Sequence, residues 1–262
     1  MTDKLVLADI RDGLLTITLD RPQKRNALSL EMFEQLGAAM HRAEHPSVRG
    51  VLVRGNGPVF CAGIDVNALA GQVGGSREDG EAFIAGLQDV FMILERSGKP
   101  SVAAVQGAAL GAGLQLALAC DLRVVAEDAT LGLLEIHYGI VPDLAGIHRM
   151  VGLCGPAHTL DLVLTGREVR PKKAQRMGFV DRVVEAGELD SAAVALVGDI
   201  MARSPLAMMA ATRLVHSAAA GDSAEENLRK VREAQLDLLA SADFMEAVTA
   251  RMARRAPNFT GK

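Results

Sequence analysis

Alternating apolar and polar residues near the start of the chain predict a β-hairpin. Residues 5–10 and 14–19 alternate in this way around Asp12-Gly13, a dipeptide that favours tight hairpin turns. The polar residues 21–28 then predict a loop, and Ser29 is placed to cap a helix that extends to about Glu44.

Short apolar runs alternate with helical segments through the middle of the chain. This alternation is typical of an α/β core with strands buried between helices. The Gly- and charge-rich residues 70–80 predict a loop. Strands are predicted at residues 51–54, 101–105, 122–126 and 178–184, and helices at 81–96, within 107–121, and at 171–177 and 188–202.

The last part of the chain has a different pattern, because helices follow one another without strands. They are predicted at residues 205–216, 223–239 and 241–255. Their apolar positions need a partner surface, either the core or another subunit. The length of 262 residues fits one large domain or a domain with a helical extension.

Composition excludes several classes of protein. A hydrophobic content of 49% is ample for a core and argues against disorder. The net charge of −4 and a pI near 5.9 argue against binding to nucleic acid or to an anionic membrane. The three cysteines have no metal-ligand spacing and predict reduced thiols. We therefore expect no bound metal. The N-terminus lacks the apolar core of a signal peptide, so we expect a cytoplasmic protein.

Residues 107–121, GAALGAGLQLALACD, place glycines where a helix begins. Such a turn exposes unpaired backbone N–H groups at the positive end of the helix dipole. These groups either hold a phosphate or stabilise an oxyanion. The apolar run over residues 102–120 is nearly long enough for a membrane span, but Gln106, Gln115 and three glycines interrupt it. A buried helix is therefore the better interpretation.

A dinucleotide-binding fingerprint does not fit this turn. Gly111 and Gly113 match G-x-G, but the next glycine position is Leu116. A second glycine turn, VFCAGIDV over residues 59–66, lies about 50 residues earlier. Two backbone donors from separate turns are what an oxyanion hole requires.

Four segments together resemble one family. They are RPQKRNALS, GNGPVFCAGIDV, VQGAALGAGLQLALACDLRVVA and LGLLEIHYGIVPD, and their order and spacing fit over nearly the entire chain. The chain resembles the crotonase (enoyl-CoA hydratase/isomerase) superfamily. The resemblance implies an α/β fold with a spiral of ββα turns over residues 1–200. It implies C-terminal helices over residues 201–262 that build a homotrimer, or a hexamer of two trimers.

The resemblance also implies a coenzyme A thioester substrate, with no cofactor apart from the CoA that the substrate carries. Carried over by position, the oxyanion donors are the backbone N–H groups of Ile64 and Ala112. Ile64 follows the first glycine turn, and Ala112 stands at the start of the helix. Charge that develops on the thioester oxygen would be met by two fixed dipoles.

The resemblance places acids at further positions. The first is Gln115, where related hydratases carry glutamate; an amide can orient water but cannot accept its proton. The second is Glu135, which lies between apolar neighbours and should have a raised pKa suited to proton transfer. Asp143 follows eight residues later, as an acid does in the dienoyl-CoA isomerase branch; it either acts in catalysis or caps a helix that begins at Leu144.

The remaining candidates concern the coenzyme. Lys24 and Arg25 could meet its phosphates, and the backbone around Ala62 and Asp65 would hold adenine. Basic and aromatic residues of the tail match one that completes a neighbouring subunit's CoA site; these are Arg255, with Arg254, and Phe259. His137 and His148 match no catalytic position and are interpreted as polar or surface residues.

Three functions follow from this site. The first is an enzyme that moves the double bond of an enoyl-CoA, with Glu135 as acid and base. The second is an enoyl-CoA hydratase in which Gln115 orients water. The third is an acyl-CoA-binding protein without catalytic activity.

Overall fold

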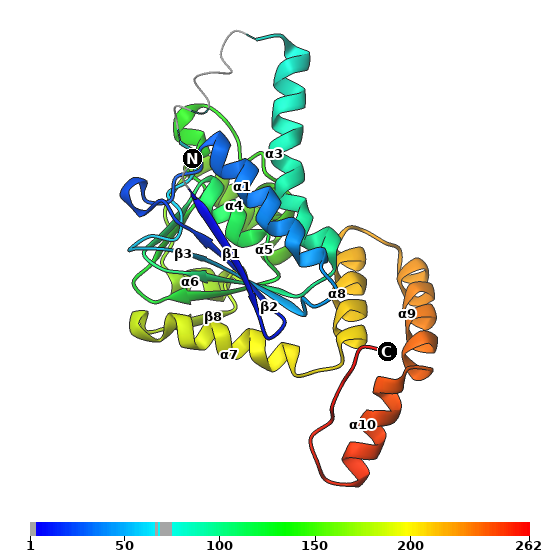
Figure 1. Cartoon of the computed structure of the whole chain (residues 1–262). Coiled ribbons are helices and arrows are strands. Elements are labelled where there is room, and N and C mark those ends of the chain that lie inside the picture. The colour runs from blue at the N-terminus through cyan, green and yellow to red at the C-terminus, as the bar shows by residue number, and fades with distance from the viewer. Residues whose placement is uncertain (1–3, 66–67, 69–74) are drawn as a thin grey trace.

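The computed structural model describes residues 4–65, 68 and 75–262 (Figure 1). Residues 70–74 of the predicted loop lie outside this part of the chain. A six-stranded sheet has the order β1-β2-β3-β4-β6-β8, and a small second sheet pairs β5 with β7. The strands are β1 Val6–Arg11, β2 Leu14–Leu19, β3 Gly50–Gly55, β4 Ser101–Val105, β5 Ala108–Leu110, β6 Leu122–Ala126, β7 Thr130–Gly132 and β8 Arg182–Val184.

Helices surround the large sheet and extend beyond it at the C-terminal end. They are α1 Leu30–His41, α3 Arg77–Ser97, α4 Ala112–Leu118, α5 Gly146–Thr165, α6 Pro171–Met177, α7 Leu189–Met201, α8 Pro205–Ala219, α9 Ala224–Leu239 and α10 Ala242–Met252. Short 3-10 turns are η1 Pro22–Lys24, η2 Arg42–Glu44, η3 Glu135–Tyr138 and η4 Ala186–Glu188.

Local chemistry explains many of these boundaries. The hairpin β1–β2 is antiparallel and turns at Asp12 and Gly13, both with positive φ, as the sequence predicts. The Ser29 side chain accepts the N–H of Met32 and so caps α1. The same cap begins four further helices, α3, α8, α9 and α10. Such a cap satisfies a backbone donor that the helix leaves unpaired.

The central strands are buried on both faces, which is why they are continuous apolar runs. In β3, Val51 and Val53 pack in the larger core cluster, whereas Leu52 between them packs in a second cluster with α7. In β4, Ala103 packs in the larger cluster and Val102 in the second one. All strand pairs after the hairpin are parallel, so the predicted α/β core is confirmed.

The structure corrects the sequence prediction at several element ends. Helix α3 begins at Arg77, four residues before the predicted start, because Ser76 caps it. Helix α5 begins at Gly146 with Ala145 at its N-cap and no side-chain cap bond, so the predicted helix start at Leu144 is wrong. The strand predicted over residues 178–184 is confined to β8. The short strands β5 and β7 carry no hydrophobic pattern of their own, and sequence patterning missed them.

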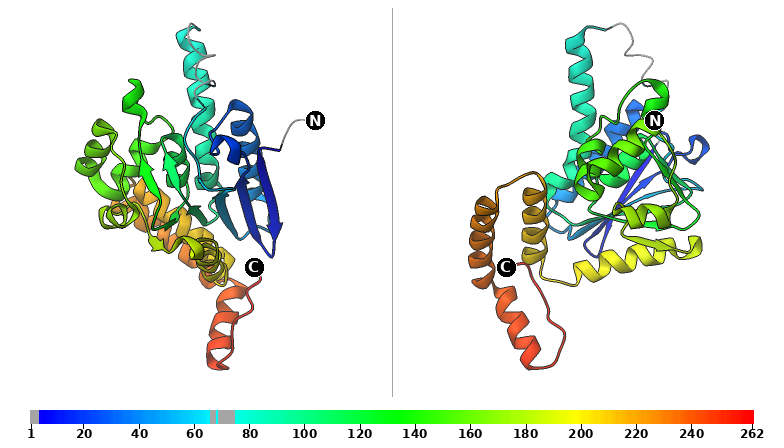
Figure 2. Two further views of the ribbon diagram at one scale, coloured as in Figure 1. Left: turned by 90° about the vertical axis from the view of Figure 1, so that its left-hand side faces the viewer. Right: turned by 180° about the vertical axis from the view of Figure 1, so that it is seen from behind.

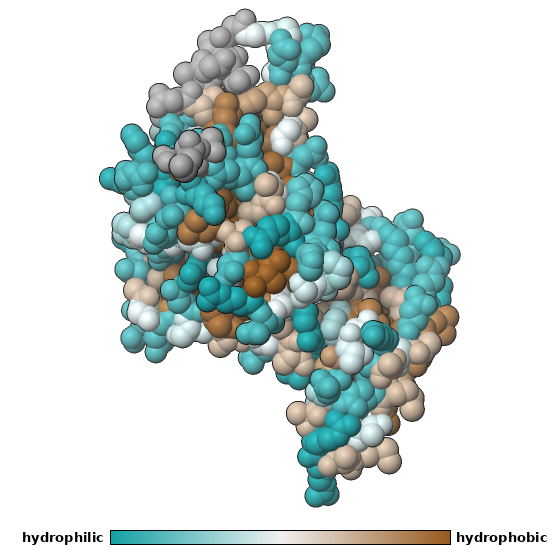
Figure 3. All heavy atoms as spheres, viewed as in Figure 1, coloured by the Kyte–Doolittle hydropathy of each residue, from teal (hydrophilic) through white to brown (hydrophobic). Residues whose placement is uncertain are grey.

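The C-terminal helices project away from the core. Figure 2 shows α10 projecting beyond the sheet in both views and α9 standing apart from the sheet in the right-hand view, and Figure 3 shows apolar surface among the polar residues in this region. Large apolar side chains on α9 and α10 are exposed; they include Leu228, Leu236, Leu239, Phe244, Met245 and Met252. Within the described residues, no single helix is long and apolar enough to cross a membrane; α7 and α8 meet that test only as a pair bent by 106°.

Candidate active site

Successive turns of the chain stack in register and bring distant loops together. Each turn has a strand of the large sheet, then a short extended segment, then a helix. The short segments form a second stack, since Cys61 pairs with Ala109 and β5 pairs with β7. Equivalent positions of consecutive turns therefore become neighbours, although about 50 residues separate Cys61 from Ala109.

The two glycine turns meet backbone to backbone. Cys61 accepts the N–H of Leu110 at 3.1 Å and donates its own N–H to the Ala108 oxygen at 3.1 Å. A Cβ atom on Gly113 would lie 2.3 Å from the Cys61 oxygen, and one on Gly63 would lie 2.9 Å from the Leu110 oxygen. Only glycine permits this approach.

Both predicted oxyanion donors lie where the two turns meet. Ala112 begins α4, and Ile64 pairs with Leu28 at the end of the other turn. A Cβ atom on Gly63, next to Ile64, would lie 3.9 Å from the Ala112 nitrogen. Among the described residues, neither the Ile64 N–H nor the Ala112 N–H donates a hydrogen bond. Two free donors that converge from separate turns, one of them at a helix start, are suited to binding a developing negative charge.

Glu135 lies beside these donors. Its side chain is almost fully buried, and its Oε1 would lie 3.4 Å from a Cβ atom on Gly111, the residue before Ala112. Burial raises the pKa of the Glu135 carboxyl; a hydrogen bond from Gln115 lowers it, and the charge of Asp143 raises it. Within the described part of the chain, Oε2 of Glu135 is buried without a hydrogen-bond partner. A carboxyl with these properties is suited to proton transfer.

Gln115 is buried and fully engaged at its oxygen. Its Nε2 donates to Oε1 of Glu135 at 2.8 Å. Its Oε1 accepts the N–H of Leu144 at 2.8 Å and the N–H of Gly146 at 3.0 Å. The side chain therefore connects α4 with η3, which carries Glu135, and with the turn at Leu144 and Gly146.

Asp143 is not a helix cap. Helix α5 begins three residues later, and its N-cap Ala145 makes no side-chain bond. The half-buried carboxyl of Asp143 has a pKa raised by burial, and its charge acts on Glu135. The Asp143 backbone oxygen accepts Nε2 of Gln88 on α3 at 2.7 Å, which fixes this turn. Of the two interpretations of Asp143, capping is wrong.

Comparison with known proteins identifies the family. A sequence model of the enoyl-CoA hydratase/isomerase family matches residues 9–262. The chain belongs to this family. A Delta(3,5)-Delta(2,4)-dienoyl-CoA isomerase, peroxisomal, of Arabidopsis thaliana is 31% identical over 98% of this chain and 96% of that protein. A carnitinyl-CoA dehydratase of Salmonella typhi is 36% identical, over 96% of this chain and 97% of that one.

A solved structure has the same fold as this family member. A Thermobifida fusca YX protein, assigned as an enoyl-CoA hydratase and crystallised in complex with CoA, superposes with a TM-score of 0.83 at 35% identity. The match covers 90% of this chain and 93% of that one. The predicted crotonase-like fold is therefore confirmed, as is the prediction of an enzyme in the isomerase and lyase group.

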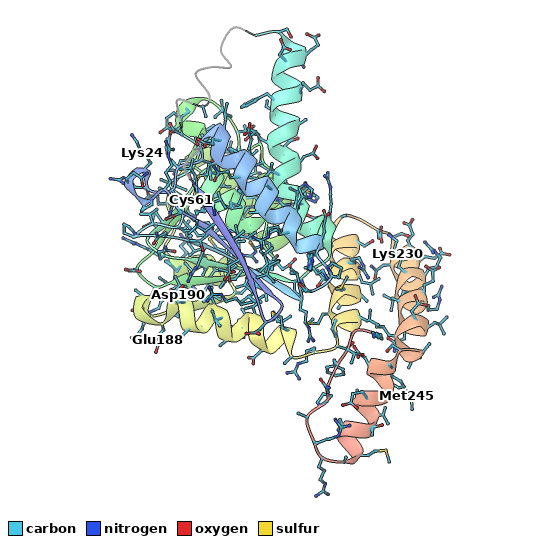
Figure 4. All side chains as sticks on the ribbon, in the orientation of Figure 1. Lys24, Cys61, Glu188, Asp190, Lys230 and Met245 are labelled. Carbon is cyan, nitrogen blue, oxygen red and sulfur yellow. The ribbon has the colours of Figure 1, made fainter. Side chains whose placement is uncertain are left out.

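Lys24 and Arg25, the two cations predicted to contact the coenzyme, are exposed in this family member. Lys24 ends η1, and Arg25 follows it with a positive φ of 51°. Figure 4 shows Lys24 at the tip of a loop that points away from the core. Arg25 also accepts the N–H of Ala62 at 3.0 Å, so the loop is anchored beside the first glycine turn. The Asp65 carboxylate forms an ion pair with Arg21 at 2.8 Å.

Arg255 and Phe259 lie on the C-terminal side of α10, in a part of the chain that stands apart from the sheet and from α4. They belong to the C-terminal segment that follows α10 (Figure 1). Arg255 pairs with Glu246 through contacts of 2.6 and 2.9 Å. One chain alone does not bring this tail to its own oxyanion hole.

Sequence reasoning missed the residue that holds the loops around the site. Asn26 is fully buried with a φ of 53°. Its Oδ1 accepts the N–H of Arg21, and its Nδ2 donates to the oxygens of Asn56 and Val59. The signal that could have found it is an Asn within a charged loop, because Asn tolerates a positive φ and bonds to nearby backbone.

Other reactive side chains are engaged elsewhere, exposed, or, in the case of Cys61 in the first glycine turn, held protonated. His137 contacts the Gly166 oxygen at 3.1 Å, and His148 is exposed. Burial raises the pKa of Cys61 to about 12, so its thiol stays protonated and is not a nucleophile. Among the described residues, no group of three or more His, Cys, Asp and Glu side chains could hold a metal ion.

Proposed function

We propose that this enzyme moves the double bond of an enoyl-CoA thioester, with Glu135 as acid and base. The observation that supports this is the difference between its two acid positions. Glu135 keeps a buried carboxylate oxygen without a partner among the described residues, whereas Gln115 has an amide whose oxygen accepts two backbone N–H groups. Isomerisation needs one group that moves a proton, but hydration also needs a group that activates water.

The proposed reaction has two proton transfers. Oε2 of Glu135 removes a proton from the carbon next to the thioester carbonyl, and the electrons of that C–H bond move into an enolate. The N–H groups of Ile64 and Ala112 bind the resulting negative charge on the thioester oxygen. Glu135 then returns the proton to the far carbon of the allylic system, which restores the carbonyl. No water is consumed and no cofactor is needed.

The arrangement of Gln115 argues against hydration. A carbonyl oxygen has two lone pairs, and both of those on Gln115 are directed to the backbone of the turn at Leu144 and Gly146. The oxygen therefore has no lone pair left to accept a proton or a hydrogen bond from water. Glu135 would have to activate water and protonate carbon by itself.

Asp143 supports a dienoyl-CoA as the substrate. Its half-buried carboxyl is near enough to Glu135 for its charge to raise the pKa of that acid. In a conjugated dienoyl thioester the two carbons that exchange protons lie farther apart than in a mono-enoyl one. Two acids with raised pKa values are suited to such a relay, one at each carbon.

For binding, we propose that Lys24 and Arg25 contact the phosphates of CoA and that the backbone at Ala62 and Asp65 holds its adenine. We further propose that residues 201–262 form the contacts of a homotrimer or a hexamer. The exposed apolar side chains of α9 and α10 support this. Arg255 and Phe259 would then complete the CoA site of a neighbour. All three cysteines are free, in keeping with a cytoplasmic enzyme.

The test is incubation with a 3-enoyl-CoA in D₂O. We expect a conjugated 2-enoyl-CoA to form with deuterium at its γ-carbon, where Glu135 returns the proton, and the α-protons of the 3-enoyl-CoA to exchange when the first step reverses. The Glu135→Gln variant should lose both and still bind acyl-CoA, with a rate lower by about 10²–10⁴. Hydration faster than isomerisation, or tight binding without exchange, would refute the proposal.

A further inference from the structure

The side chain of Gln115 contacts the acid Glu135 and the turn that carries Asp143. Its Nε2 lies 2.8 Å from Oε1 of Glu135. Its Oε1 accepts the N–H of Leu144 at 2.8 Å and that of Gly146 at 3.0 Å. Leu144 directly follows Asp143. One amide group therefore joins the two acidic parts of the site.

We propose that Gln115 is a positioning residue that fixes Glu135 and Asp143 relative to each other and directs the transferred proton to Oε2 of Glu135. This inference rests on the proposed function. The amide NH₂ group can only donate, so Oε1 of Glu135 accepts in both protonation states. A proton on Oε1 would point at the N–H of Gln115. Oε2, which is free of other partners among the described residues, takes the proton from substrate carbon and later returns it.

The packing leaves Gln115 little freedom to do anything else. The residue is 1% exposed. A Cβ atom on Gly146 would lie 2.6 Å from Oε1 and 2.7 Å from Cγ of Gln115. The backbone at Gly146 therefore packs directly on the amide, and only glycine leaves room for it.

An amide is the only side-chain group of this length that serves both contacts. A glutamate at position 115 would set a second acceptor against Oε1 of Glu135, and the two carboxyls would have to share a proton. A methionine would fill the space but would neither donate nor accept two bonds. The charge of Asp143 acts on Glu135, whereas the ring of His137 contacts the Gly166 oxygen.

Gln115→Met tests the proposal, and Gln35→Met is its matched control. Oε1 of Gln35 also accepts two backbone N–H groups, from Leu5 and Val6, and its Nε2 also contacts a glutamate, Glu31. Both substitutions thus remove the same kinds of contact. We expect Gln115→Met to lower kcat for isomerisation about ten-fold or more, with little change in KM. We expect Gln35→Met to lower only stability.

A titration separates positioning from a merely structural role. Enzyme labelled with ¹³C at the glutamate carboxyls reports the Glu135 titration by NMR, and Glu135→Gln identifies its signal. Loss of the Gln115 donor removes a bond to the charged form, so the pKa of Glu135 should rise in Gln115→Met and stay unchanged in Gln35→Met. A wild-type titration and a wild-type kcat in Gln115→Met would overturn the inference.

A second variant covers the case in which Gln115→Met does not fold. Gly146→Ala presses on the amide from the turn and should shift the Glu135 titration in the same direction; an unshifted titration there overturns the inference. The titration needs no substrate. If the wild-type enzyme does not exchange protons, the proposed function fails, while the NMR comparison still decides the role of Gln115.

Discussion

The contact between the two glycine turns leads to a sharp prediction for Gly113→Ala. The proposed oxyanion donors are backbone groups, so no ordinary side-chain deletion removes them. Gly113, however, is the second residue of α4, and a Cβ atom there would lie 2.3 Å from the oxygen and 2.8 Å from the Cβ of Cys61. The added methyl group must separate the turn that carries Ile64 from the helix start at Ala112.

The size of the effect follows from these distances. To reach ordinary van der Waals separation, α4 must retreat from Cys61 by roughly 1 Å. Displacement of one oxyanion donor costs about 3–4 kcal/mol of barrier, or a factor of about 10²–10³ in rate. The free energy of unfolding should change by less than the barrier does. Overpacking costs about 1–3 kcal/mol, and alanine regains up to about 1 kcal/mol through its helix propensity.

The assay is α-proton exchange of an acyl-CoA in D₂O, with thermal unfolding measured on the same samples. Gly113→Ala should stay folded and lose about 100-fold or more in exchange rate. The control is Gly198→Ala in the exposed face of α7, where a Cβ atom meets nothing within 4 Å. That variant should gain up to about 1 kcal/mol of stability and keep its activity. Wild-type exchange by folded Gly113→Ala would refute the reasoning.

Three further predictions concern titratable groups. Asp143→Asn should block isomerisation of a 3,5-dienoyl-CoA, while NMR still detects α-proton exchange by Glu135. Equal loss of isomerisation and of exchange would contradict a relay. Exchange by the wild-type enzyme should increase with pH through a midpoint above 4.5, the ordinary pKa of a glutamate, because burial raises the pKa of Glu135; a rate already constant below that pH would contradict this. His216 on α8 contacts Asp121 at 2.5 Å, and this hydrogen bond raises the pKa of His216 above its usual 6.5. The stabilisation is therefore complete below pH 6.5 and is lost as pH rises through the raised pKa. The difference in Tm between wild type and His216→Gln should shrink over that range, and a constant difference would show that the pair is not responsible.

The sequence alone determined much of the fold because its signals are local. Serines at helix starts, Asp12-Gly13 in the hairpin and Gly111 before α4 each fix backbone within a few residues. The motif set also identified the family and predicted Ile64 and Ala112 as oxyanion donors. These inferences needed no knowledge of which segments touch.

The tertiary structure alone decided which partners the polar residues of the site have. From the sequence, Gln115 was only a residue that differs from the glutamate of related hydratases. Asp143 could be either a helix cap or a catalytic acid. The partners of Gln115 lie 20, 29 and 31 residues along the chain, and no local preference encodes them. They meet because successive turns of the spiral stack in register, which buries Glu135 against Gly111 and sets Gln115 between the two acids. The sequence determined which groups are present, and the stacking decided which of them have a partner.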